Sequence, residues 1–82
     1  ADAVERELMI ATVEVGPEAR GQVMDLVRIF EANVLNVGSN AMMVSLSGAP
    51  SRVSDFEELL EPFGIAEVQR TGKVALSSLD RA

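Results

Sequence analysis

The segment ELMIATVEV at residues 7–15 constrains the fold more than any other part of the chain, because both of its alternating faces are largely apolar. Successive side chains of a β-strand point to opposite faces of the sheet. One face carries Met9, Ala11, Val13 and Val15, and the other carries Leu8, Ile10 and Thr12. A strand of this kind is typical of the middle of a sheet that is covered on both sides.

Two amphipathic segments follow the pattern of helices. Gly16-Pro17-Glu18 predicts a helix start with proline at the first position, and helical spacing of apolar residues continues to Ala32. A second helix is expected from Pro50-Ser51 and is ended by Pro62 and Gly64. Its predicted apolar stripe consists of Val53, Phe56, Leu59, Leu60 and Phe63.

The remaining segments alternate like strands. Residues 33–37 and 41–47 flank Gly38-Ser39-Asn40, which predicts a β-hairpin, and a last strand region spans 65–77. The order βαββαβ indicates an α+β, ferredoxin-like fold. We expect a single domain over residues 1–82, with a four-stranded antiparallel sheet and two helices on one face.

That architecture leaves one face of the central strand uncovered. Each helix has a single apolar side, so both together cover only one face of the sheet. Leu8 and Ile10 on the other face require a partner's sheet or a second domain. Because small domains often gain stability by association, a homodimer is predicted, with Leu8 and Ile10 as contact candidates.

Charge and composition exclude several classes of function. The chain has 13 acidic and 7 basic residues, a net charge of −6, which argues against binding nucleic acid or an anionic membrane surface. No apolar run approaches the roughly 18 residues of a membrane span. Cysteine is absent, so no disulfide framework or thiolate chemistry is expected.

No constellation of residues supports catalysis, and no catalytic, cofactor-binding or metal-binding residue is predicted. Histidine and cysteine are absent, so the usual general base, zinc ligands and thiolate nucleophile are missing. The acidic residues at 55–61 could form a weak divalent-cation site or the solvated face of a helix. The second interpretation is favoured, because charge runs on helices are usually surface.

The stretch FGIAEVQRTGKVALSSLD raises a structural question at Arg70-Thr71-Gly72. A hairpin at Thr71-Gly72 and one unbroken strand through 65–77 are alternatives, but an unbroken strand would place Arg70 and Gly72 in an apolar row. A bent edge strand with a bulge near Gly72 is favoured. Arg70, Thr71, Gly72 and Lys73 are therefore further candidates for partner contact.

Three motifs in order, VERELMIATVEV, VMDLVRIFEANVLNV and LLEPFGIAEVQRTGKVALS, resemble the C-terminal domain of acetohydroxyacid synthase (acetolactate synthase) small subunits. The resemblance runs from Val4 to Ser77. The chain departs from the family pattern at Glu31, Asn33, Asn36 and Ser78-Leu79. At Glu31, Asn33 and Ser78 the departure removes positive charge.

The resemblance implies a non-catalytic regulatory subunit of branched-chain amino-acid biosynthesis that associates with a catalytic subunit. Thiamine diphosphate, magnesium and FAD would belong to that catalytic subunit, and none of them to this chain. The family's N-terminal ACT domain, which binds the effector valine, is expected to be absent from this sequence. Localisation would be cytoplasmic in a bacterium and plastid or mitochondrial in a eukaryote.

Two other classes of function remain open. A free-standing ACT-like module that senses a small molecule between two protomers would share the fold and the dimer. A small enzyme is disfavoured by the missing chemistry.

Overall fold

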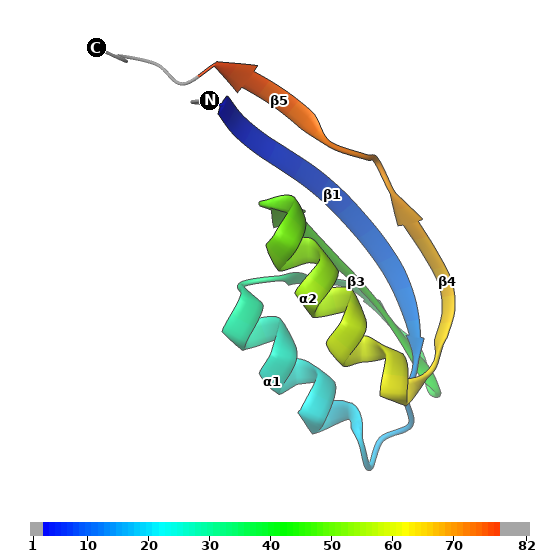
Figure 1. Ribbon diagram of the computed structural model, residues 1–82. Coiled ribbons are helices and arrows are strands. Elements are labelled where there is room, and N and C mark those ends of the chain that lie inside the picture. The colour runs from blue at the N-terminus through cyan, green and yellow to red at the C-terminus, as the bar shows by residue number, and fades with distance from the viewer. Residues whose placement is uncertain (1–2, 78–82) are drawn as a thin grey trace.

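The computed structural model describes residues 3–77 and has the predicted ferredoxin-like fold (Figure 1). The elements in chain order are β1 (Ala3–Glu14), α1 (Arg20–Phe30), β2 (Asn33–Val37), β3 (Ala41–Gly48), α2 (Pro50–Leu60), the 3₁₀ turn η1 (Glu61–Phe63), β4 (Ile65–Arg70) and β5 (Val74–Ser77). The sheet order is β2-β3-β1-β4, and all pairs are antiparallel. The predicted βαββαβ order is confirmed.

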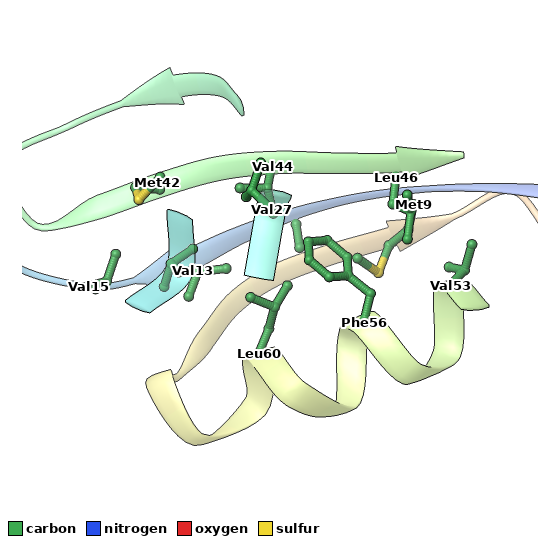
Figure 2. Close-up of a cluster of buried hydrophobic side chains, with 12 residues drawn as sticks. Met9, Val13, Val15, Val27, Met42, Val44, Leu46, Val53, Phe56 and Leu60 are labelled. Atoms are coloured by element: carbon green, nitrogen blue, oxygen red, sulfur yellow. The ribbon is translucent and has the colours of Figure 1, made fainter. Parts of the chain in front are cut away.

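The core lies between the sheet and the two helices, which cover the same face (Figure 1). Met9, Ala11 and Val13 of β1 are at most 1% exposed, as the alternation in residues 7–15 predicts. All three belong to one core cluster, in which Met9 and Val13 lie among side chains of β3 and α2 (Figure 2). The other buried hydrophobic residues are Val15, Val23, Val27, Met42, Val44, Leu46, Val53, Phe56 and Leu60.

The start of α1 differs from the prediction. Residues 17–19 form a turn in which the Ala19 N–H donates to the Gly16 carbonyl at 3.2 Å, and the helix begins at Arg20. The Arg20 guanidinium donates to the carbonyls of Gly38 and Ser39 in the β2–β3 turn. This tertiary contact joins the first turn of α1 to the hairpin. It cannot be predicted from the helix preferences of neighbouring residues.

One residue of the predicted α2 stripe is also placed differently. Leu59 is 48% exposed, whereas Val53, Phe56 and Leu60 are fully buried. At 3.6 residues per turn, Leu59 lies at the margin of the stripe that these three residues define. The neighbouring Leu60 occupies the core position instead.

The last strand region is a bent edge strand, as predicted, and both of its parts pair with β1. Met9 pairs with Arg70 in β4, and Arg6 pairs with Val74 in β5, so the three residues 71–73 lie opposite only Glu7 and Leu8. One extra residue in one strand of an antiparallel pair is a β-bulge. Gly72 within it has φ +80°, a left-handed conformation that glycine adopts readily.

The bulge changes the face to which the following side chains point. Arg70 lies on the helix side, because its partner Met9 is in the core. Without an extra residue, Val74 and Leu76 would continue on that side. Because they pair with Arg6 and Val4 instead, they share the opposite face with Leu8 and Ile10.

Beyond the bulge, residues 3–6 of β1 and β5 form a two-stranded ribbon, here called the arm. Strand β3 ends at Gly48 opposite Glu7, so the arm extends past the rest of the sheet (Figure 1). The molecule is accordingly elongated, with extents of 51 × 21 × 19 Å. Its radius of gyration is 14.4 Å, whereas a compact domain of this length would have about 12 Å.

The left-handed conformation at Gly72 predicts that Gly72→Ala destabilises the domain by about 1–2 kcal/mol. No heavy atom lies within 4 Å of the position a Cβ would take at either Gly72 or Gly21, so space is not the cause. Gly21→Ala in α1 is the matched control and is expected to stabilise by up to about 1 kcal/mol. Urea unfolding measures both changes. Equal effects of the two substitutions would contradict the assigned backbone conformation.

Candidate functional site

The sheet face that points away from the helices, here called the open face, carries an apolar strip along β1. Leu8 and Ile10, the two contact candidates from the first strand, are each 38% exposed there. Their cross-strand neighbours on this face are Ser45, Ser47 and Gln69. The strip therefore has an apolar centre and polar flanks, which is the composition expected of a protein-interaction surface.

The arm extends this strip beyond the body of the domain. Val4, Val74 and Leu76 are 44%, 62% and 75% exposed. With Arg6 and Ser77 they line an open groove of about 330 Å³. Contiguous exposed apolar surface of this kind marks interaction sites. Sequence reasoning did not include these three residues. The face of Val74 and Leu76 depends on the single extra residue of the bulge, and Val4 precedes the strand predicted at residues 7–15.

The bulge itself is held by Thr71. Its backbone N–H donates to the Leu8 carbonyl at 3.0 Å, and its hydroxyl oxygen accepts from the Leu8 N–H at 3.1 Å. The side chain thus takes the place of a backbone acceptor that the extra residue has displaced. Thr71 and Leu8, predicted separately as contact candidates, are brought together by these two bonds.

Arg70 anchors the bulge to β1 and α2. Its Nε and Nη2 donate to the two carboxylate oxygens of Glu7 at 3.0 and 2.5 Å, a bidentate pair. Nη1 donates to Glu57 at 2.9 Å, and Nη2 also donates to the Ser54 hydroxyl oxygen at 3.1 Å. Arg70 thus lies on the helix side of the sheet, with its side chain 29% exposed.

The environment of this cluster favours the charged forms of both Glu7 and Arg70. The hydrogen bonds from Arg70 hold the pKa of the Glu7 carboxyl below its ordinary value of 4.5, and the Gly72 N–H and the charge of Lys73 act in the same direction against burial. The bonds to Glu7 likewise raise the pKa of Arg70. The Glu7 side chain is only 7% exposed. In the sequence, the one sign of this buried carboxylate is that Glu7 alternates with the core-facing residues of β1.

The other predicted positions are more exposed. Lys73 lies beside a depression of about 550 Å³ that Glu5, Pro50 and Ser51 also line. Glu31 is the left-handed C-cap of α1 and Asn33 is the first residue of β2. Ser78 and Leu79 lie outside the described residues.

One member of the acidic run in residues 55–61, Glu57, has a structural role, because it forms an ion pair with Arg70. Within residues 3–77, no group of three acidic side chains is arranged to hold a metal ion. None of the helices in the described part of the chain is long and apolar enough to cross a membrane.

The lowered pKa of Glu7 gives a pH-dependent prediction for Glu7→Gln. A carboxyl group with a depressed pKa in the folded state contributes stability above its unfolded pKa and loses it as pH falls through the folded value. Near pH 7, the urea midpoint of the wild-type protein should therefore be higher than that of Glu7→Gln. The difference between the two midpoints should shrink below about pH 4. Glu5→Gln, on the exposed part of the same strand, controls for the loss of one negative charge. A difference that stays constant from pH 3 to 7 would contradict a role for the ionised Glu7.

Comparison with known proteins places this chain among the small subunits of acetolactate synthase. Residues 6–79 match the family model described as the small subunit of acetolactate synthase. A probable acetolactate synthase small subunit of Archaeoglobus fulgidus is 39% identical over 74 residues, 90% of this chain and 46% of that protein. A chloroplastic acetolactate synthase small subunit 1 of Nicotiana plumbaginifolia is 37% identical over 73 residues, 89% of this chain and 16% of that protein.

The crystal structure of the acetolactate synthase small subunit from Thermotoga maritima has the same fold. It superposes with a TM-score of 0.90 at 30% identity, covering 98% of this chain and 49% of that one. This chain thus spans about half the length of its archaeal relative and of this structure. The expectation of a small-subunit domain, and not of a catalytic chain, is confirmed: the chain belongs to the C-terminal domain family of acetolactate synthase small subunits.

Proposed function

We propose that this chain is a regulatory, non-catalytic domain of acetohydroxyacid synthase in branched-chain amino-acid biosynthesis. The observation that carries the proposal is the match of residues 6–79 to the small-subunit family. The chain forms a homodimer and couples the regulatory subunit to the catalytic one. Thiamine diphosphate, magnesium and FAD are bound by the catalytic subunit. This chain is located in the same cellular compartment as the complex.

The open face supports the homodimer. Leu8 and Ile10 lie on the long central strand, where a second sheet would bury them. Burial of apolar surface is worth roughly 25 cal/mol per Å². Burial of the partly exposed aliphatic side chains on the central strand would therefore favour such association.

The edge loop at residues 70–73 supports a separate contact with the catalytic subunit. Lys73 is exposed at the root of the arm, beside the start of α2 at Pro50. The Arg70 cluster fixes this loop relative to α2 through Glu57 and Ser54. A loop held by a rigid scaffold is a typical position for binding residues. We assign the open face to the dimer and this loop to the catalytic subunit.

A reconstitution assay tests the coupling to the catalytic subunit. This chain, added to a cognate catalytic subunit, is expected to bind it and raise its activity without making it sensitive to valine. The full-length small subunit should confer both activation and valine inhibition.

Lys73→Glu should weaken binding of this chain, whereas Arg28→Glu on the exposed side of α1 is the control with the same change in charge. Failure of the chain to bind at all would contradict the coupling role. Valine binding to the isolated chain would instead support a free-standing ACT-like sensor.

The homodimer predicts that Ile10→Asp dissociates the protein without unfolding it. A carboxylate placed in a dry interface would lack a partner, so we expect dimer dissociation to become at least about 100-fold easier. Ile29→Asp on α1, where Ile29 is 67% exposed, is the matched control and should leave the dimer intact. Sedimentation equilibrium gives the dissociation constants, and circular dichroism checks the fold. A dimer that tolerates Ile10→Asp would exclude the open face as its interface.

A further inference from the structure

The charges on the open face lie at opposite ends of one strand. Along β1, the residues on this face run from Arg6 through Leu8, Ile10 and Thr12 to Glu14. Glu67 of β4 pairs with Thr12 and adds a second negative charge near the Glu14 end. The pattern is thus positive, apolar and negative, with Ile10 midway between Arg6 and Glu14.

Within residues 3–77, Arg6, Glu14 and Glu67 have no acidic or basic partner. Among residues 3–77, the ion pairs involve Arg28, Asp25, Arg70, Glu7 and Glu57 only. The Arg6 guanidinium donates one hydrogen bond to the Glu5 carbonyl, which leaves most of its donors open. Arg6, Glu14 and Glu67 are all exposed, so each is able to meet a charge on another molecule.

We propose that two copies of this domain stack open face to open face with their β1 strands antiparallel and with Ile10 of each copy at the two-fold axis. The proposal rests on the dimer of the proposed function and specifies its orientation. In a two-fold interface, residue i of one copy meets residue j of the other, and j meets i. With Ile10 on the axis, Arg6 of each copy lies over Glu14 of the second copy.

The spacing along the strand makes this arrangement symmetric. Arg6 and Glu14 are each four residues from Ile10, which is roughly 13 Å along a strand. Two sheets pack about 10 Å apart, with strand directions offset by about 30°. That offset shifts each end of the strand sideways by about one strand, so Arg6 is within reach of the negative end that Glu14 and Glu67 form together.

The opposite orientation is disfavoured by the same charges. If the two β1 strands ran in parallel, Arg6 would lie over Arg6 of the second copy, and Glu14 would lie over Glu14. Like charges brought together at an interface weaken association. The chain also has a net charge of −6, so an orientation that offsets this repulsion locally is favoured.

The shape of the open face agrees with the antiparallel register. A shallow hollow of about 190 Å³ lies at the Thr12 end and is lined by Thr12, Asn36, Gly38, Ala41, Met42 and Met43. With Ile10 on the axis, Leu8 of the second copy lies over Thr12 and fills this hollow. Val4 and Leu76, in the outer part of the arm, then lie at the far end of the second copy's sheet. They are far from Val4 and Leu76 of the second copy.

A charge exchange tests the orientation. Arg6→Glu and Glu14→Arg should each weaken dimerisation by about 10-fold at low salt, because each single change places like charges together twice per dimer. The double variant should return to within about 3-fold of the wild type. Arg28→Glu and Glu58→Arg, which change the net charge equally on the helix side, are the controls. Single variants that match these controls, or a double variant as weak as the singles, would overturn the proposed pairing.

Cross-linking gives an independent test, because the chain contains no cysteine and each introduced thiol is unique. With a short bis-maleimide, Ile10→Cys should form a covalent dimer, whereas Val4→Cys should not. Cross-linking of both would indicate parallel strands, and cross-linking of Val4→Cys alone would place the axis in the arm. Either result, or a protein that stays monomeric at millimolar concentration, would overturn the orientation. If Ile10→Asp dissociates the dimer while these tests fail, the dimer face stands and only the orientation is wrong.

Discussion

The pairing of strand β1 is the interaction on which the rest of the structure depends. This strand pairs with β3 along one edge and with β4 and β5 along the other, so it organises both the core and the arm. Its odd-numbered side chains from Met9 to Val13 fill the core beneath the helices, and its even-numbered side chains form the open face. Since side-chain direction alternates strictly along a strand, the residues that stabilise the fold also fix which residues remain for a partner.

The bulge at residues 71–73 gives the open face its length. One extra residue moves Val74 and Leu76 to the side of Leu8 and Ile10, and Gly72 supplies the left-handed conformation that the insertion requires. Thr71 compensates the displaced backbone bonding at Leu8, and Arg70 ties the same point to Glu7 and α2. Each residue at 70–72 thus has its own structural role. Arg70 forms the ion pairs, Thr71 supplies a hydroxyl that completes the strand pairing, and Gly72 adopts the left-handed conformation of the bulge.

The sequence predicted the fold because its strongest signals are local. The alternation in residues 7–15, the helical stripe of α2 and the turn at Gly38-Ser39-Asn40 each depend on neighbours close in the chain. The features that it missed depend on distant contacts. The late start of α1 involves the bond of Arg20 to the β2–β3 turn, and the Glu7–Arg70 pair joins residues 63 positions apart. Predicting that Val74 and Leu76 lie on the open face would have required the pairing register between β5 and β1. The pattern of apolar residues does not determine that register.

The ion cluster connects the two surfaces assigned to partners. Glu7 is the first residue of β1 that pairs with β3, so it lies where the arm joins the body of the sheet. Arg70 holds this junction to α2 from the helix side, while Leu8, the next residue, lies on the open face. A contact at the 70–73 loop would therefore act on the same backbone that carries Leu8 of the open face, the face assigned to the proposed dimer. Because the pair is bidentate and Glu7 is almost fully buried, movement of the loop relative to β1 would separate charges in a poorly solvated place. The loop, the arm root and the start of the apolar strip are thus expected to move as one unit, which would connect the two proposed interfaces physically.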